Sequence, residues 1–432
     1  MRLLDQYRAV RARTLELASP LSPEDQGVQS MPDASPTKWH LAHTTWFFET
    51  FVLAPHLGDH RPFDPAFKFL FNSYYEAVGP QHDRARRGGL SRPSLHEVQS
   101  YRRHVDQAIG RMLEAGDASP AVASTITLGL HHEQQHQELL LTDIKHAFGS
   151  HPLQPAYQAV AQPTAPASRA AVAPAPALAF RAFEGGVVWI GHQGAAFAFD
   201  NEGPRHRSFL DPFAIAERPV TCGEYLAFMR DGGYSRPELW LSDGWRMVEG
   251  ERWQAPLYWQ KAPEDAPEDV QKPKGSDDAP GWLVYTLAGR RAVDANEVVA
   301  HVSYYEADAY ARWAGARLAT EEEWEHAASS AAVSGHFAGH FAESGRLHPA
   351  AAAPGMFGDV WQWTRSAYGG YPGYRVPEGP IGEYNGKFMS NQMVLRGGSC
   401  LTPAGHVRAT YRNFFPPATR WQMSGIRLGR DL

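Results

Sequence analysis

One stretch of the sequence divides the chain and limits what it can fold into. From residue 159 to residue 179 alanine dominates, with four prolines interspersed. Such a mixture lacks large apolar side chains, so it builds no core and is typical of a semi-extended linker. A chain of 432 residues is long enough for two or three domains with cores of their own. We therefore expect one domain over residues 1–158 and a second over residues 180–432.

Four segments before this linker have the apolar spacing of amphipathic helices. They cover residues 3–17 and the stretches that follow Ser35, Ser94 and Ser119. Ser94 begins a Ser-x-x-Glu capping box, and Ser119 is an N-cap followed by a first-turn proline. Four helices of this length predict an up-and-down bundle, whose interior is a natural place for a metal ion held by facing helices.

The fourth helical segment carries His132 and His136 in the run His-Glu-Gln-Gln-His. Residues four apart on a helix lie one above the other on the same face, so both imidazoles can hold one ion. The helix after Ser35 is apolar at nearly every turn and carries His40 and His43. We expect at least one of these two to have an ordinary structural role, such as a hydrogen bond to a backbone carbonyl.

Three neutral imidazoles that meet inside a bundle would form a facial triad. Such a triad leaves up to three coordination positions open for substrate and dioxygen on Fe(II). Zn(II) accepts the same ligands, so the ligand set alone leaves the metal open.

Composition excludes several other classes of protein. The 41 basic and 47 acidic side chains give a net charge of −6 without a long run of either sign, which argues against nucleic-acid binding. Cys222 and Cys400 are too few and too far apart for a disulfide framework or a thiolate cluster. The first residues lack the apolar core of a signal peptide, and no apolar run is long enough to span a membrane. We expect a cytoplasmic protein without membrane contact.

Between the second and third helical segments lies a long connection, about residues 58–93. It contains Tyr74, Tyr75, Arg84 and Arg87. A connection of this length more often has a function, such as substrate binding, than serves only to join two helices.

After the linker, glycine, tryptophan and short strand-like runs prevail. One helix is expected over residues 303–313, and another begins at the capping box of Thr320 and Glu323. This composition, with short strand-like runs and two helices, predicts an irregular α+β domain with many loops. Such a domain is suited to forming a binding cleft.

The second half resembles the formylglycine-generating-enzyme, or sulfatase-modifying-factor, family, a relative of the C-type lectins. The stretches that carry the resemblance include Phe-Glu-Gly-Gly at 183–186, Gly-Ala-Arg-Leu-Ala-Thr-Glu-Glu-Glu-Trp at 315–324, Gly-Asp-Val-Trp-Gln-Trp at 358–363 and Leu-Arg-Gly-Gly-Ser at 395–399. The first half is similar to the DinB-like helical bundles. In this order, with the histidine motifs at 43 and 132–136, the whole chain resembles the ergothioneine-biosynthesis sulfoxide synthases of the EgtB type.

This resemblance implies a reaction in which Fe(II) and O2 couple a thiol to C2 of hercynine and give a sulfoxide. It identifies His43, His132 and His136 as the iron ligands. The quaternary ammonium of hercynine requires an aromatic or dipolar surround because it cannot be hydrogen-bonded. We expect the aromatic residues near Trp363, Tyr384 and Phe414 to contribute to this surround. The residues that the resemblance assigns to substrate binding are Gln135, Tyr384, Asn413 and Phe414.

Two departures from the family pattern concern the thiol. Phe415 stands where some members carry an acidic residue that binds the amino group of γ-glutamylcysteine, and Ile381 stands where they carry a catalytic tyrosine. Both point to the branch that uses free cysteine. Phe415 would then line the thiol side of the substrate site, and the phenols of Tyr74 and Tyr75 would take the catalytic role.

In that branch, Arg84 and Arg87 would bind the carboxylate of cysteine through bidentate pairing.

Several alternatives remain open at this point. The same architecture can use another sulfur or selenium donor, or histidine itself as in ovothiol biosynthesis. We expect the ovothiol reaction less, because the usual enzyme of that pathway carries a carboxy-terminal methyltransferase domain that residues 1–432 do not contain. A non-catalytic lectin-like binding protein and a formylglycine-generating enzyme are further candidates. The three histidines disfavour the lectin-like binding protein. A formylglycine-generating enzyme requires an active-site cysteine pair, and Cys222 and Cys400 do not resemble such a pair. The oligomeric state is open.

Overall fold

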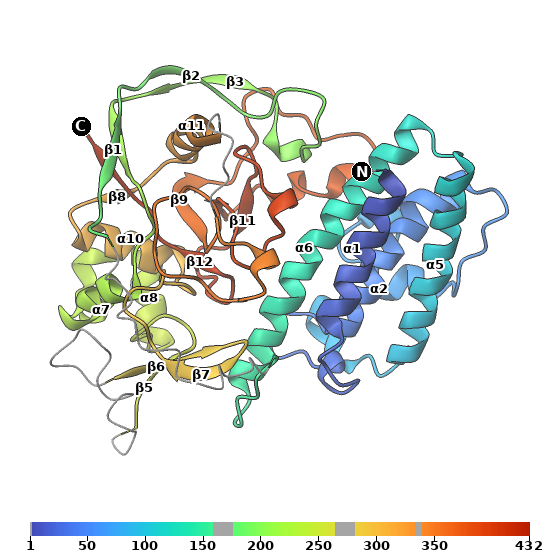
Figure 1. Cartoon of the computed structure of the whole chain (residues 1–432), viewed down its shortest axis with the longest axis horizontal. Coiled ribbons are helices and arrows are strands. Elements are labelled where there is room, and N and C mark those ends of the chain that lie inside the picture. The colour runs from blue at the N-terminus through green and yellow to red at the C-terminus, as the bar shows by residue number, and fades with distance from the viewer. Residues whose placement is uncertain (1, 159–175, 264–280, 333–338) are drawn as a thin grey trace. The chain divides into compact units, whose positions relative to one another are not determined.

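The computed structural model describes residues 2–158, 176–263, 281–332 and 339–432 and divides into two compact units (Figure 1). Unit 1 consists of Met1–Leu153 together with Val376–Lys387, and unit 2 consists of Gln154–Arg375 together with Phe388–Leu432. Most of the predicted linker, residues 159–175, lies outside the described residues. The predicted combination of a helical bundle with an α+β domain is confirmed.

Unit 1 is a bundle of four main helices, in which α1 packs against α6, and α2 packs against both α5 and α6 (Figure 1). Two short helices, α3 and α4, lie between α2 and α5. The helices of unit 1 are α1 (Leu3–Ala18), α2 (Thr37–Phe48), α3 (Ala54–His56), α4 (Phe67–Leu70), α5 (Leu95–Ala115) and α6 (Pro120–Ser150). A π-helical turn, η2 (Glu49–Leu53), joins α2 to α3.

The predicted helix starts are confirmed. At the start of α5, the Ser94 side chain accepts a hydrogen bond from the Glu97 N–H, and the Glu97 carboxylate accepts one from the Ser94 N–H. At the start of α6, the Ser119 hydroxyl accepts from the Val122 N–H. These bonds satisfy N–H groups that have no partner inside the helix.

A buried ionic cluster joins three helices of the bundle. The Glu133 carboxylate of α6 accepts hydrogen bonds from Arg11 Nη1 of α1 at 2.8 Å and from Arg102 Nη2 of α5 at 2.9 Å. The Thr14 hydroxyl donates to the same carboxylate at 2.6 Å. Burial acts to raise the pKa of Glu133, but the charges of Arg11 and Arg102 prevail and lower it to about 2. Glu133 is therefore an anion in the folded protein.

Unit 2 contains two four-stranded sheets and two smaller ones. The first sheet has the order β1-β4-β13-β8 with antiparallel pairs, and the second has the order β11-β10-β9-β12 with a parallel pair between β12 and β9. The smaller sheets are β2-β3 and β5-β6-β7. The first sheet comprises β1 (Phe180–Phe183), β4 (Phe213–Ala216), β13 (Leu428–Asp431) and β8 (Arg317–Leu318). The second comprises β11 (Asn413–Phe415), β10 (Met393–Arg396), β9 (Trp361–Ala367) and β12 (Ser424–Gly425).

The remaining elements of unit 2 cover and connect these sheets. The strands of the smaller sheets are β2 (Gly186–Ile190), β3 (His206–Leu210), β5 (Trp259–Lys261), β6 (Trp282–Thr286) and β7 (Gly289–Ala292). The helices are α7 (Cys222–Arg230), α8 (Ser242–Gly250), α10 (Tyr304–Trp313) and α11 (Glu321–Ala332). The capping box predicted at Thr320 and Glu323 is present before α11. From α11, Trp324 enters a core that also contains Ile190 and Phe213.

Removing the charge of Glu133 should destabilise the bundle strongly. Glu133→Gln removes the carboxylate that pairs with buried Arg102, whereas Arg11 keeps its ion pair with Asp106 at 2.7 Å. Breaking a buried pair in this way costs about 3–5 kcal/mol. Glu114→Gln is the matched control, because Glu114 pairs with Arg8 on the surface and such pairs contribute about 0–1 kcal/mol. Urea unfolding followed by far-UV circular dichroism measures both changes. Equal losses in the two variants would contradict the assigned role of Glu133.

Candidate metal centre

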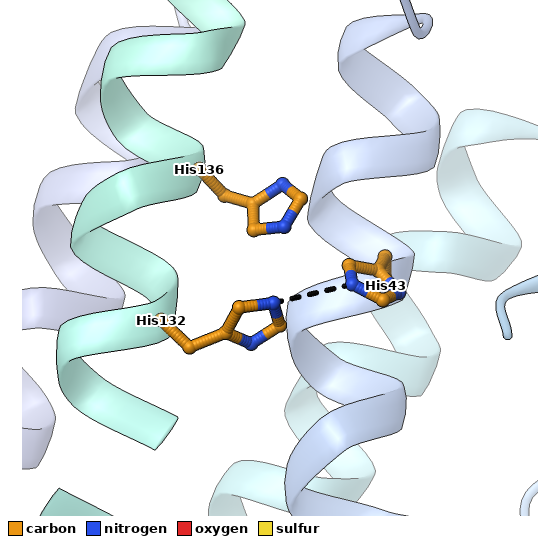
Figure 2. Close-up of side chains that lie close together, drawn as sticks. All are labelled: His43, His132 and His136. Carbon is orange, nitrogen blue, oxygen red and sulfur yellow. Dashed lines mark hydrogen bonds between the residues drawn. The ribbon is translucent and has the colours of Figure 1, made fainter. Parts of the chain in front are cut away.

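Three histidines from two helices of unit 1 point toward one another (Figure 2). His43 comes from α2, and His132 and His136 come from successive turns of α6. Their ligand atoms all lie within 4.8 Å of one another, and His43 Nε2 is 3.3 Å from His132 Nε2. Two nitrogens that each lie about 2.1 Å from one tetrahedral ion are about 3.4 Å apart. The arrangement therefore fits a mononuclear metal centre.

Close approach of α2 and α6 brings these histidines within reach of one ion. Gly129 lies one turn before His132, and a Cβ atom at this position would be 2.5 Å from the ring of Phe48 on α2. A residue larger than glycine at position 129 would collide with the Phe48 ring, so the ring or the helix would have to move.

The three imidazoles are held in the neutral form that a metal requires. His43 is 0%, His132 2% and His136 9% exposed. Burial lowers the pKa of His132 to about 3. It also places the pKa values of His43 and His136 well below the ordinary value, and the neighbouring His132 adds to both shifts. Three neutral nitrogen donors suit Fe(II) and Zn(II) alike.

The orientation of His43 is fixed by a backbone carbonyl and two indole rings. Its Nδ1–H donates to the Phe71 carbonyl oxygen at 2.6 Å, which leaves the Nε2 lone pair directed at the other histidines. Its ring is stacked on Trp39 at 4.5 Å and on Trp46 at 5.6 Å between ring centroids. The tautomer and the ring plane of this ligand are thus set by its surroundings.

The orientation of His136 is set by a chain of two further residues. His40 Nε2 is 3.0 Å from an oxygen of the Asp143 carboxylate, and His40 Nδ1 is 2.8 Å from His136 Nδ1. With His40 Nε2–H donating to Asp143, His40 Nδ1 accepts from His136 Nδ1–H, so His136 Nε2 keeps its lone pair for the centre. Of the two histidines on α2, His43 faces the centre and His40 supports it.

Gln135 and Tyr384, two of the residues predicted to bind substrate, lie next to this centre within unit 1. Tyr384 belongs to the segment Val376–Lys387, and its hydroxyl donates to Gln135 Oε1. The Tyr384 ring is 5.5 Å from the ring of His132. Ile381 lies one 3-10 turn before Tyr384, and its backbone carbonyl accepts the Tyr384 N–H at 3.1 Å.

Tyr74 and Tyr75 lie in the same neighbourhood. Tyr75 is fully buried and packs against Trp46 at 5.6 Å, the indole that is stacked on His43. Tyr74 is stacked on Tyr75 at 4.6 Å and lies 6.4 Å from the ring of Tyr384. Burial, with smaller effects of the neighbouring phenols, places the pKa of Tyr75 well above its ordinary value.

The two predicted arginines differ in their placement. Arg87 is buried, its guanidinium carbon lies 3.4 Å from the ring centroid of Trp39, and it donates to the hydroxyls of Ser35 and Ser73. Burial, with a smaller effect of the Arg84 charge, lowers the pKa of Arg87 to about 9. Arg84 is exposed and donates to the backbone carbonyl of Asp33.

The other predicted substrate residues belong to unit 2. Trp363 on β9 is buried, and its indole N–H donates to the Val302 carbonyl at 2.9 Å. Asn413, Phe414 and Phe415 form β11, where alternation along the strand places Asn413 and Phe415 on one face. Phe414 is stacked on Tyr368 at 4.0 Å. A role of these residues in substrate binding stays a prediction.

The sequence also contains a signal for the supporting residues His40 and Asp143. Asp143 follows His136 by seven residues and His40 precedes His43 by three, spacings that place each pair on one helix face. The hydrogen bond from His43 to the Phe71 carbonyl could not be predicted in this way, because every residue type has a backbone carbonyl oxygen.

Comparison with known proteins agrees with this division into two parts. Residues 6–140 match the DinB superfamily. Residues 181–354 and 350–432 match the sulfatase-modifying factor enzyme 1-like domain.

Curated relatives extend the similarity over nearly the whole chain. A hercynine oxygenase from Mycolicibacterium thermoresistibile is 31% identical over 98% of this chain and 93% of its own length. The chain belongs to the hercynine oxygenase family. Another member, from Mycobacterium tuberculosis, is 30% identical over 98% of this chain and 97% of its own length. The ergothioneine biosynthesis protein 1 of Schizosaccharomyces pombe is 26% identical over 54% of this chain and 28% of its own length.

Among the described residues of this family member, no helix combines the length and the apolar character needed to cross a lipid bilayer. Cys222 and Cys400 are both buried. Burial raises the pKa of the Cys222 thiol well above its ordinary value, so this cysteine is not an activated nucleophile.

Substitutions at His43 and His40 should separate a metal ligand from its support. His43→Ala removes a ligand and should abolish most binding of Fe(II) under anaerobic conditions. His40→Phe keeps all three ligands but removes the hydrogen bonds from His40 to His136 and to Asp143. Loss of such a support typically weakens metal affinity about 10–100-fold. His96→Ala, at an exposed position on α5, is the control. Iron content by mass spectrometry measures all three, and full occupancy in His43→Ala would refute the ligand assignment.

Proposed function

We propose that this chain is a non-haem iron sulfoxide synthase that couples cysteine to C2 of hercynine with O2, giving hercynylcysteine sulfoxide in ergothioneine biosynthesis. The names of relatives that match nearly the full length of the chain support an oxygenase acting on hercynine. The observation that carries the proposal is the group of three neutral, buried imidazoles within 4.8 Å of one another.

The reaction balances without a further reductant. Formation of the C–S bond removes two electrons from the thiol and the C2–H group, and oxidation of the sulfur to the sulfoxide removes two more. Dioxygen accepts all four, with one oxygen atom retained in the sulfoxide and the other released as water. Fe(II), when bound by His43, His132 and His136, would activate dioxygen and favour the thiolate form of cysteine.

Gln135 and Tyr384 would orient hercynine. The Tyr384 hydroxyl donates to Gln135 Oε1. This bond sets which end of the amide is the acceptor, so the NH2 end is the one that would donate to the substrate imidazole. The Tyr384 ring beside His132 offers an aromatic face to the quaternary ammonium.

Tyr75 would hold a proton at its hydroxyl oxygen. Because burial keeps its pKa well above the ordinary value, the phenol stays protonated at neutral pH and can act as a donor but not as a base. Tyr74, stacked on Tyr75 and closer to solvent, would connect this donor to Tyr384.

Arg87 would bind the carboxylate of cysteine. In the described part of the chain its charge is buried against Trp39 and two hydroxyls, with no carboxylate at ion-pair distance. A buried cation without a counter-charge is costly, so an anionic substrate would relieve that cost on binding. Arg84, which is exposed, would add to the positive potential that attracts this carboxylate.

The second candidate function uses the same architecture with γ-glutamylcysteine or another sulfur or selenium donor. A non-catalytic lectin-like protein is disfavoured, because such a protein has no use for three metal-type imidazoles oriented by Phe71, His40 and Asp143.

Free cysteine should be preferred over γ-glutamylcysteine. Phe415 replaces a carboxylate that would pair with the γ-glutamyl amine, and a charge-assisted contact is worth roughly 1.5–3 kcal/mol, about a ten- to hundredfold effect on specificity. The test measures kcat/KM with hercynine and each thiol after anaerobic loading with Fe(II), with mass spectrometry of the product. Phe415→Glu should shift the ratio toward γ-glutamylcysteine, whereas Phe415→Leu should not. A wild-type preference for γ-glutamylcysteine would refute the assignment of cysteine.

Replacing Tyr74 and Tyr75 together by Phe should change the product more than substrate binding. Without the phenols the thiolate still binds and is still oxidised, so turnover should shift from the sulfoxide to cysteine sulfinate. Iron content and hercynine affinity should stay near those of the wild type. Tyr305→Phe in unit 2 is the control. An unchanged sulfoxide yield in the double variant would assign both tyrosines to packing alone.

A further inference from the structure

A second group of metal-type side chains lies in unit 1, apart from the three histidines described above. Glu49 begins the π-helical turn after α2, His60 lies in the connection that follows α3, and His104 lies on α5. One potential ligand atom from each lies within 4.8 Å of the others. Three segments that are distant in the sequence therefore meet at this cluster.

The contacts of Glu49 show a carboxylate held in a fixed position. Its Oε1 is 3.2 Å from His60 Nε2 and accepts the Phe63 N–H at 3.1 Å, and its Oε2 accepts the Tyr101 hydroxyl at 2.7 Å. The Glu49 side chain is 9% and the His60 side chain 4% exposed. Bonds of this kind orient a carboxylate in the way that outer partners orient metal ligands.

His104 does not share in these hydrogen bonds. Its Nε2 atom is buried and has no hydrogen-bond partner among the described residues. Its ring lies 5.8 Å from that of His60, between centroids. A buried nitrogen without a partner costs about 1–3 kcal/mol, and native structures rarely leave one without a reason. A cation shared with His60 and Glu49 would give this nitrogen a partner.

We propose that Glu49, His60 and His104 form a second metal site and that its ion is Zn²⁺. Two imidazoles and one carboxylate are a common zinc ligand set, completed by water at the fourth position. Mg²⁺ and Ca²⁺ prefer oxygen donors, so they suit this set poorly. The ion replaces the hydrogen bond between His60 and Glu49.

The second metal site has a structural consequence for the metal centre formed by the three histidines. Tyr101, which donates to Glu49, packs against Phe67 at 5.0 Å and Phe71 at 6.5 Å, between ring centroids. The carbonyl of Phe71 is the group that orients His43. Zinc at the second site thus holds the connection between α2 and α5 in the position that directs His43 toward its partners.

Zinc stoichiometry in the full-length chain without an affinity tag tests the proposal. His43→Ala combined with His132→Ala removes the first centre, so one zinc per chain should remain after dialysis against Zn²⁺ and metal analysis. Adding His104→Phe, which keeps a ring at this position, should reduce zinc to none. Adding His96→Ala instead, an exposed histidine on the same helix, should leave one. The readout needs neither iron nor turnover, so it is independent of the proposed function.

Thermal unfolding gives a second measurement in the same variants. Zn²⁺ should raise the unfolding midpoint of the His43→Ala/His132→Ala chain, because an ion that binds only the folded state stabilises it. This rise should disappear with His104→Phe and with Glu49→Gln, and circular dichroism checks that each variant is folded. If His104→Phe does not fold, Glu49→Gln decides. Absence of zinc in the His43→Ala/His132→Ala chain, or zinc binding that survives the loss of His104 and of the Glu49 charge, would overturn the proposal.

Discussion

The carboxylate of Glu133, bound by Arg11 and Arg102, is the interaction on which the geometry of the bundle depends. It ties α6 to α1 and α5 at the residue directly after His132. Neighbouring residues of a helix point in different directions, so this turn is anchored on one side while it presents a ligand on the other. The ionic cluster and the metal centre share one helical turn. The contacts that hold Glu133 in place therefore also restrict the position of His132.

Charge is distributed unevenly between these two features. In the cluster, Arg102 pairs with Glu133, and Arg11 pairs with both Glu133 and Asp106, so two cations meet two carboxylates. The centre instead has three neutral ligands and the buried cation of Arg87 nearby. A divalent ion held there would keep its full charge. The surroundings of such an ion would favour anionic ligands, which supports the proposal of a substrate with a thiolate and a carboxylate.

The sequence predicted features that depend on local geometry. The pair His132 and His136, the caps of α5 and α6 and the four-helix pattern follow from rules that act within one or two helical turns. The partners of the ligands depend on tertiary packing instead. The carbonyl of Phe71 lies 28 residues from His43 in the sequence, and the hydroxyl of Tyr384 lies 249 residues from Gln135. Periodicity carries no information over such separations, and the cluster of Glu49, His60 and His104 was missed for the same reason.

The segment Val376–Lys387 has a consequence for how such a chain can change in evolution. It lies far along the sequence but belongs to unit 1, where Glu383 accepts the N–H groups of Glu76 and Ala77 and Tyr384 binds Gln135. A cut at the Ala/Pro-rich stretch would therefore separate the bundle from a segment of its own unit. Recombination that exchanges one half between relatives would combine a bundle with a foreign segment, so we expect the two halves to change together.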